Sequence, residues 1–209
     1  MELEIPVDFS PSKIVCVGRN YADHAAELGN EVPKEPLLFL KAPSAVIRSG
    51  DPIRIPTQSV HVEHEGELAV IIGKTCKNIG EDVDPFQFVK GYSCLNDVTA
   101  RDIQRKDVQF TRGKSFDTFC PMGPVITSDL NVSDIRVTCS VNGDIRQEGR
   151  TSQMVFPVEF LIQYISRQMT LNAGDVIATG TPAGVSKLRS GDVCEVTIEG
   201  IGTLRNPVE

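Results

Sequence analysis

The sequence contains no tryptophan, has only three histidines, and lacks any run approaching the about 20 consecutive apolar residues of a membrane-spanning helix. It also lacks an excess of positive charge, because 28 acidic side chains outnumber 21 basic ones and give a net charge of −7. A nucleic-acid-binding protein needs a basic face for the phosphates. The first residues show no basic segment followed by an apolar one, as a secretory signal would. We therefore expect no nucleic-acid or membrane partner.

Paired cysteine motifs are also missing, although the chain has six cysteines. None of them forms a C-x-x-C pair, and most lie inside apolar runs. This pattern favours reduced, buried thiols over disulfides or a zinc site. Free thiols indicate a reducing compartment, which predicts a cytoplasmic protein, or a mitochondrial one in a eukaryote. The cysteines are Cys16, Cys76, Cys94, Cys120, Cys139 and Cys194.

Short β-rich segments dominate the chain, and its 209 residues suffice for a single domain over 1–209 with its own core. Turns rich in Gly, Asn and Asp separate these segments, and the pair Asn142-Gly143 between two strand-like flanks predicts a hairpin. The expected strands are 13–17, 37–40, 53–55, 67–72, 89–95, 124–127, 136–141, 176–178, 193–198 and 202–205.

Only three segments are expected to be helical, namely 20–28, 99–106 and 157–169. Thr99 would cap the second helix, and Asp102 three residues later would complete a capping box. Many strands and few helices indicate an α+β, mainly β fold and argue against a doubly wound parallel sheet.

Two carboxylates stand at the start of the most apolar strand. Glu65 and Glu67 are two residues apart and therefore share one strand face, and the apolar run 68–72 follows them directly. A third acid, Asp97, follows the strand-like run 89–95. Buried carboxylates need a cation, and oxygen ligands favour Mg²⁺, Mn²⁺ or Ca²⁺ over zinc. From the spacing alone, a solvated strand face with Asp97 as a turn residue is the more common arrangement.

A candidate catalytic dyad lies in the first helical segment. His24 and Glu27 are at i and i+3 and so are neighbours on a helix, where the carboxylate would orient the imidazole as a general base. Arg101 and Gln104 have the same spacing just after Asp97, and Lys114 lies in a short polar segment. Taken singly, a histidine–glutamate pair is common on a protein surface, and each of these cations is more often a solvated surface group than a substrate ligand.

Taken together and in this order, five motifs resemble those of the fumarylacetoacetate hydrolase family. The resemblance covers nearly the whole chain, from Lys13 to Glu199, and is closest to the short single-domain members that act as acylpyruvases or oxaloacetate decarboxylases. The motifs are GRNYADH (18–24), EGELAVIIG (65–73), NDVTARDIQ (96–104), GKSF (113–116) and GTPAGV (180–185).

The resemblance implies a mixed β-sheet roll with few short helices, usually a homodimer, that holds Mg²⁺ or Mn²⁺, with Ca²⁺ as a possible substitute. It also implies that segment 20–30 is a mobile lid. Two positions depart from the pattern, since Glu63 stands where Asp is frequent and His64 where an aromatic residue is frequent. The roles it implies are metal ligation by Glu65, Glu67 and Asp97, catalysis by His24, Glu27 and Lys114, and substrate binding by Arg101, Gln104, Lys114 and Thr181.

The activity that this resemblance favours first is hydrolysis of the C–C bond of a 3-acylpyruvate. His24, oriented by Glu27, would take a proton from water, the hydroxide would attack the distal carbonyl, and the enolate of pyruvate would leave while Lys114 helps to neutralise its oxygen. Decarboxylation or keto–enol tautomerisation of oxaloacetate, and isomerisation of a hydroxydienedioate, also need a metal-bound enolate and stay open. A non-catalytic metal-binding module is the alternative of another class.

Overall fold

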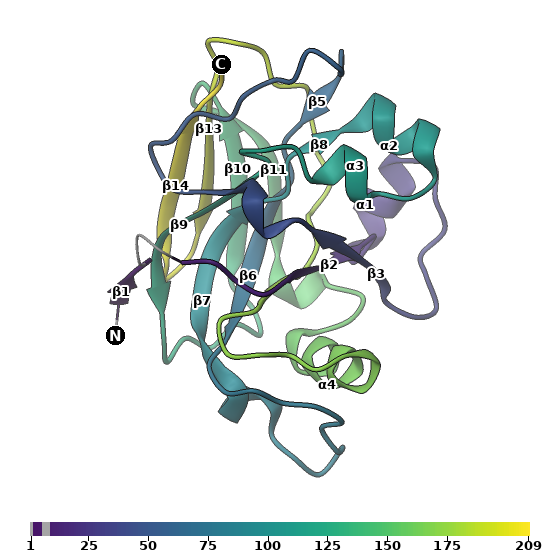
Figure 1. Ribbon diagram of the computed structural model, residues 1–209, viewed down its shortest axis with the longest axis vertical. Helices are drawn as coiled ribbons and strands as arrows, with labels where there is room; N and C mark the ends of the chain where they lie inside the picture. The colour runs from purple at the N-terminus through teal and green to yellow at the C-terminus, as the bar shows by residue number, and fades with distance from the viewer. Residues whose placement is uncertain (1, 6–8) are drawn as a thin grey trace.

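The protein, described from a computed structural model over residues 2–5 and 9–209, is built mainly from β-sheet, as the sequence predicts (Figure 1). Within these residues the large sheet has eight strands, of which seven follow the order β1-β9-β7-β6-β12-β2-β3 and β4 pairs with β9. Both β12–β2 and β4–β9 are parallel, whereas the other pairs are antiparallel, so the sheet is mixed. Its strands are β1 (Glu2–Glu4), β2 (Ile14–Gly18), β3 (Leu37–Lys41), β4 (Val46–Ile47), β6 (Gly66–Ile72), β7 (Val89–Asn96), β9 (Cys120–Thr127) and β12 (Val176–Ala178).

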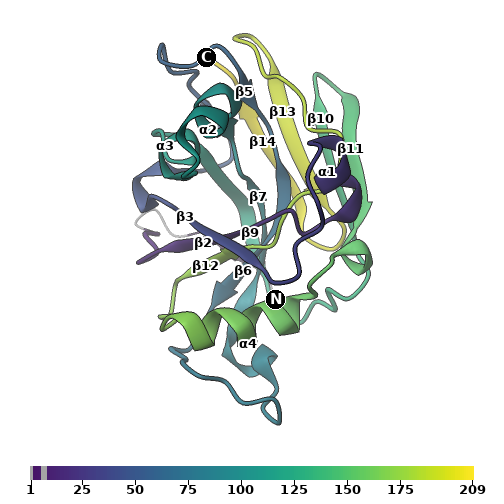
Figure 2. The same cartoon turned by 90° about the vertical axis from the view of Figure 1, so that its right-hand side faces the viewer.

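A second, antiparallel sheet in the order β11-β10-β13-β14 packs beside the large one, and Figure 2 shows it to the right of β6 and β7. Two short strands, β5 and β8, pair with each other. These elements are β5 (Val62–Glu63), β8 (Thr99–Ala100), β10 (Arg136–Val141), β11 (Asp144–Arg150), β13 (Val193–Ile198) and β14 (Gly202–Pro207); the helices are α1 (Ala22–Glu27), α2 (Arg101–Asp107), α3 (Thr111–Lys114) and α4 (Val158–Gln168).

Strand β6 lies inside the large sheet, and all seven of its residues are buried. Gly66 separates the two glutamates and faces the second sheet, where an added Cβ would lie 3.1 Å from Cys139 Cβ and 3.3 Å from Val196 Cγ1. The residue between Glu65 and Glu67 therefore has to be small so that the second sheet can approach, while the two carboxylates project from the other face.

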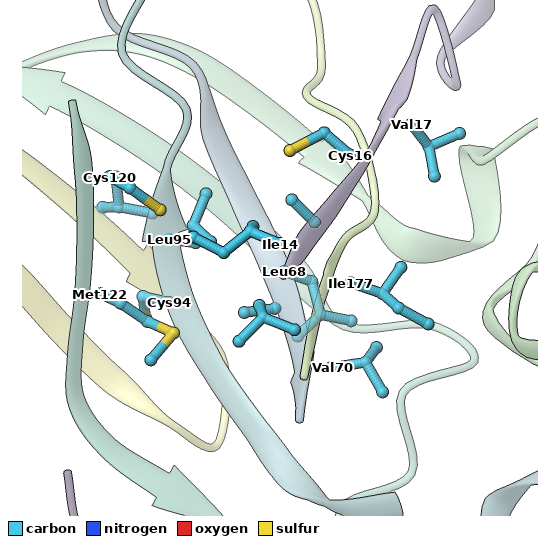
Figure 3. Packing of buried hydrophobic residues seen from close by; sticks show 14 of the residues in the cluster. Ile14, Cys16, Val17, Leu68, Val70, Cys94, Leu95, Cys120, Met122 and Ile177 are labelled. Carbon is cyan, nitrogen blue, oxygen red and sulfur yellow. The ribbon is translucent and has the colours of Figure 1, made fainter. Parts of the chain in front are cut away.

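The core joins side chains from five strands of the large sheet, among them Cys16, Val17, Leu68, Leu95 and Met122 (Figure 3). All six cysteines are free and buried, which confirms the prediction of reduced core thiols. Burial raises the pKa of the Cys94 and Cys120 thiols to about 12, so both remain protonated.

The predicted hairpin is confirmed. β10 and β11 pair across Asn142 and Gly143, whose φ angles of 55° and 86° are those of a type I′ turn. The expected helix over 157–169 is also present as α4, with Pro157 and Met169 as its caps.

The capping box predicted at Thr99 is wrong. Thr99 lies in β8, helix α2 begins at Arg101, and the Thr99 hydroxyl donates to Glu65 Oε1 at 3.2 Å and to Asp97 O at 2.9 Å. Asp102 instead accepts from Ser59 Oγ at 2.6 Å. The side chains of Thr99 and Asp102 thus form hydrogen bonds with residues distant in sequence, and these contacts override the local preference for helix capping.

Two further local predictions differ from the structure. Segment 53–55 forms only an isolated bridge from Ile53 to Val208, because it runs along the edge of the chain's last residues. Lys114, which the sequence places in a short polar segment with no helix expected, ends the short helix α3. No described helix is long and apolar enough to cross a membrane.

Asp175 fixes the parallel pairing of β2 and β12 with a fully buried carboxylate. It accepts from Ser12 Oγ at 2.6 Å, from Asn172 N at 2.7 Å and from the Lys13 ammonium. Although burial opposes ionisation, these hydrogen bonds hold the pKa of Asp175 below its usual value. The stability that it provides is therefore present above the unfolded-state pKa and is lost as the pH falls through the folded-state pKa.

We expect Asp175→Asn to lower the free energy of unfolding by about 1.5–3 kcal/mol at pH 7, since it removes charge-assisted hydrogen bonds. The difference from the unsubstituted protein should shrink below pH 3.8, the ordinary pKa of an aspartate side chain. Urea unfolding at pH 7 and at about pH 3 measures both values. An equal loss at the two pH values would contradict this account.

Candidate active site

A cavity of about 350 Å³ lies among α1, the α2–α3 segment and the ends of β2, β6 and β7. These three helices lie together at the upper right in Figure 1. The wall of the cavity contains every site residue expected from the sequence except Glu27. These residues are His24, Glu65, Glu67, Asp97, Arg101, Gln104, Lys114 and Thr181.

The three acids converge. Glu65, Glu67 and Asp97 each offer a carboxylate oxygen, and these oxygens lie within 4.8 Å of one another. All three residues are buried, with relative exposures of 5%, 2% and 0%. A solvated strand face, the more common arrangement for such a spacing, is therefore absent here.

Two buried lysines contact this cluster. Lys114 Nζ donates to Glu65 Oε2 at 2.8 Å and to Asp97 Oδ2 at 2.6 Å. Lys41 Nζ donates to Asp97 Oδ1 at 2.6 Å and to Val98 O at 3.1 Å. Burial opposes the charge of Lys114, but the Asp97 and Glu65 carboxylates raise its pKa above the usual value, so it remains an ammonium.

Arg101 links the cluster to a further acid, Glu63, and to Gln104. Its Nε donates to Glu63 Oε2 at 2.7 Å, Nη2 to Glu65 Oε1 at 2.5 Å, and Nη1 to Gln104 Oε1 at 2.6 Å. The expected meeting of Arg101 and Gln104 on one helix face is thus present. Because three guanidinium N–H groups already have protein partners, Arg101 orients Glu65 and Gln104 directly.

The charges of the two glutamates are controlled differently. Burial opposes ionisation of Glu65, but Lys114 and Arg101 hold its pKa well below the usual value. Burial and the nearby Asp97 and Glu65 carboxylates raise the pKa of Glu67 well above it. Glu67 accepts its hydrogen bond from a backbone group, Gly180 N at 2.7 Å. Glu67 is therefore the acid of the cluster that most lacks a compensating cation.

This donor set fits a hard divalent ion. Three convergent carboxylates are oxygen ligands of the type that Mg²⁺, Mn²⁺ and Ca²⁺ accept. When all four are ionised, these three carboxylates and Glu63 exceed the three cations Lys41, Arg101 and Lys114 by one negative charge. A divalent ion held by Glu65, Glu67 and Asp97 would reverse that sign and prepare the cavity for an anion.

The dyad faces this cluster from α1. His24 is buried and lines the cavity, and its Nδ1 lies 3.2 Å from Glu27 Oε2. Glu27 in turn accepts from Gly184 N at 3.0 Å. A carboxylate on Nδ1 leaves Nε2 as the proton acceptor of the neutral ring. The predicted opening and closing of segment 20–30 stays a prediction.

Hydrogen bonds from Gln147 fix the loop that carries Thr181. The Gln147 Nε2 group donates to Thr181 Oγ1 and to Pro182 O, both at 2.7 Å, and its Oε1 accepts from Gly66 N at 3.0 Å. The Thr181 hydroxyl donates to Gly66 O at 2.9 Å. Thr181 thus lines the cavity with a hydroxyl that already has protein partners, which ties the loop to the start of β6.

Comparison with known proteins identifies the group to which this arrangement belongs. Residues 13–209 match the family model described as fumarylacetoacetate (FAA) hydrolase C-terminal. The chain belongs to the fumarylacetoacetate hydrolase family. This confirms the resemblance that the five motifs indicated.

Three relatives illustrate the range of the family. The chain is 43% identical to an oxaloacetate tautomerase from Bacillus subtilis over 100% of its own length and 73% of that protein. It is 46% identical to a mitochondrial oxaloacetate decarboxylase from Dictyostelium discoideum, over 91% of this chain and 90% of that one. The crystal structure of a 5-carboxymethyl-2-hydroxymuconate delta-isomerase from Mycobacterium smegmatis superposes with a TM-score of 0.89 and 48% identity, covering 96% and 79% of the two chains.

Three residues of this fumarylacetoacetate hydrolase site are not predicted from the sequence. Lys41 is a charged residue at the end of the apolar strand β3. Asp97 stands out because it follows an apolar strand in the same way, so the same signal could have identified Lys41. Glu63 shares the parity of Glu65 and Glu67, but the family pattern marks it only as a departure. Gln147 lies in a polar strand with no local signal of its role.

Val108 stands at the rim of the cavity with an unfavourable backbone. Its φ of 64° lies in the left-handed region, which a β-branched residue rarely adopts, and its side chain is 79% exposed. With its ψ of −43°, this sparsely populated conformation costs a non-glycine residue roughly 1–3 kcal/mol. Strain of this kind often accompanies ligand-binding segments.

We expect Val108→Gly to raise the free energy of unfolding by up to about 1 kcal/mol, since glycine adopts this φ without strain but loses more entropy on folding. Val60→Gly is the matched control, because Val60 is 76% exposed but has no positive φ, and it should be destabilising. Urea unfolding of both variants decides, and a loss of stability for Val108→Gly would refute the strain argument.

Proposed function

We propose that this chain catalyses the keto–enol tautomerisation of oxaloacetate with Mg²⁺ or Mn²⁺ as its cofactor. The observation that carries the proposal is the meeting of the His24–Glu27 dyad, three carboxylates and the Lys114 ammonium at one cavity. A proton acceptor opposite a site for a dication is what enolisation of a 2-oxo acid requires. The similarity to an oxaloacetate tautomerase over the whole chain supports this choice.

The chain's own residues would move one proton between two atoms of the substrate. His24 Nε2 would take a proton from C3 of the keto form, the C2–C3 bond would become double, and the protonated His24 would return that proton to the carbonyl oxygen to give the enol. Glu27 keeps Nδ1 protonated and so orients the ring. Lys114 places a positive charge beside the cluster where the oxygen becomes negative. A dication held by Glu65, Glu67 and Asp97 would add further charge stabilisation.

Two residues would position the substrate. Gln104 Oε1 accepts from Arg101 Nη1, and the Gln104 amide nitrogen has no partner among residues 2–5 and 9–209, so it can donate to a substrate oxygen. Thr181 also lines the cavity, and its hydroxyl is held in place by Gln147. Positioning of this kind limits the motion of the reacting atoms.

Oxaloacetate decarboxylation is the second candidate, favoured by the near full-length match to a decarboxylase of similar size. In this reaction the C3–C4 bond breaks, its electron pair forms the enolate of pyruvate, and CO₂ leaves. That step needs the charge stabilisation but no proton acceptor at C3. Acylpyruvate hydrolysis, the first choice from the sequence, needs an attacking water in addition, and the relatives described above are named for other reactions, so we place it third.

Steady-state assays on one preparation separate the three activities. We expect Mg²⁺- or Mn²⁺-dependent loss of the enol absorbance of oxaloacetate to exceed both CO₂ release and cleavage of acetylpyruvate. Chelation by EDTA should abolish the activity. Faster CO₂ release than tautomerisation would replace the proposal by the decarboxylase, and metal binding without turnover of any 2-oxo acid would favour a binding module.

A further inference from the structure

Four cationic side chains besides the histidine line the cavity: Arg19, Arg101, Arg105 and Lys114. Arg101 and Lys114 are buried and paired with the acids of the cluster. Arg19 and Arg105 have no hydrogen bond or ion pair to any side chain in the described part of the chain. The cavity therefore holds two guanidinium groups that are available to a ligand.

Arg19 is held in an unusual conformation. Its φ of 59° is left-handed, and the residues on both sides of it are fixed. Gly18 ends β2, and the side chain of the fully buried Asn20 donates to Phe156 O at 3.0 Å and Thr179 O at 2.8 Å. Backbone strain that the surroundings impose in this way is concentrated at ligand clamps and active sites.

Arg105 lies one helical turn beyond Arg101 on the same face of α2. Arg101 is 3% exposed and contacts the acidic cluster, whereas Arg105 is exposed, so α2 leads from the buried end of the cavity to its mouth. One helical turn measures about 5.4 Å. The carboxyl carbons of a four-carbon diacid are three C–C bonds of about 1.5 Å apart, so at most roughly 4.5 Å, which is somewhat less than one turn.

The net charge of the cluster explains why a dicarboxylate would need these two arginines. A divalent ion would leave the buried cluster with about one positive charge, enough for one carboxylate or an enolate oxygen. A dicarboxylate brings a second negative charge, and a buried or half-buried carboxylate needs its own partner. Arg19 and Arg105 are the cavity-lining cations, among the described residues, that the cluster does not already use.

We propose that Arg19 and Arg105 form a subsite for the distal carboxylate of a 2-oxo dicarboxylate. The inference rests on the proposed function and adds to it the residues that select dicarboxylates over 2-oxo monocarboxylates. The inner carboxylate and the 2-oxo group would face the acidic cluster, and the distal carboxylate would lie between the start of α1 and the C-terminal half of α2. Arginine suits this role because its planar fork donates two hydrogen bonds to a carboxylate.

Calorimetric titration with malate and lactate, in the presence of Mg²⁺, tests the subsite without turnover. The two 2-hydroxy acids differ by the distal carboxylate. Wild-type protein should bind malate more tightly than lactate, and Arg19→Gln should lower this preference by about 10- to 100-fold while leaving the lactate affinity unchanged. Arg105→Gln should act in the same direction. Arg189→Gln, an exposed arginine outside the cavity, should change neither affinity.

Several outcomes would overturn the subsite: wild-type protein that binds malate no more tightly than lactate, a preference unchanged in both variants, or an equal loss for both ligands. Retained lactate binding shows that a variant is folded, and Arg19→Lys should recover part of the preference. The proposed reaction and the subsite can be refuted independently. If malate discrimination depends on Arg19 but oxaloacetate is not converted, the subsite stands and the proposed reaction falls.

Discussion

His24→Asn should lower the rate of oxaloacetate tautomerisation by about 10²–10⁴-fold, the usual contribution of a general base. The buried imidazole is the candidate proton acceptor that faces the three carboxylates, and asparagine can still donate to Glu27 while having no basic nitrogen. The loss should appear in kcat with little change in KM, because the ring acts on the substrate's proton and not on its carboxylates.

The chain offers a matched control for this variant. His61 also forms a histidine–glutamate pair, with Nε2 at 2.8 Å from Glu63 Oε1, but it is half-exposed and does not line the cavity. His61→Asn should keep the rate within a few-fold of the wild-type value. Equal rates for His24→Asn and wild-type protein would remove the dyad from the mechanism and would favour the decarboxylase, whose C–C cleavage needs no base at C3.

Glu67→Gln should abolish metal binding without destabilising the metal-free protein. Its carboxylate lacks a cation partner and its pKa is raised by burial and by Asp97 and Glu65. In the metal-free protein, ionising Glu67 therefore costs stability, and this loss grows as the pH rises above the unfolded-state value of 4.5. A neutral amide removes that loss and can still accept from Gly180 N. We expect the Mn²⁺ affinity to fall by more than about 100-fold, beyond what an outer-sphere change causes.

Asp97→Asn is the comparison that makes this result informative. Asp97 is paired with both Lys41 and Lys114, so its loss leaves two buried ammonium groups without a full partner and should lower the free energy of unfolding by about 3–5 kcal/mol. Mn²⁺ titration followed by calorimetry and urea unfolding with EDTA measures both quantities. If Glu67→Gln binds Mn²⁺ as wild-type protein does, the three-carboxylate site is wrong.

Strand and hairpin positions could be predicted because their causes are local. The Asn142-Gly143 pair fixes the β10–β11 turn through two residues that tolerate positive φ, and the apolar run of β6 follows from its burial on both faces. The capping box at Thr99 failed for the opposite reason. The Thr99 hydroxyl bonds to Glu65, 34 residues away, and no local rule anticipates that competitor.

The acids of the site illustrate the same division. Glu65, Gly66 and Glu67 follow a strand period of two, so the chain itself determines that both carboxylates share one face while the glycine lies on the other. Their protonation does not follow from the period. Two glutamates with identical chemistry have pKa values shifted in opposite directions, because Lys114 and Arg101 contact Glu65 but not Glu67.

By itself, then, the sequence determined the mainly β fold through its local patterns and the family through five motifs in a fixed order. The roles of Glu65, Glu67, Asp97 and the His24–Glu27 dyad came from that resemblance, since spacing alone favoured solvated surface groups. Only the tertiary structure decided that Lys41 pairs with Asp97 across 56 residues, that Arg101 is held by Glu63 across 38, and that Arg19 and Arg105, among the described residues, stay unpaired at the cavity. These facts depend on which strands and helices become neighbours, and the energy of a charge is determined by its neighbours in space.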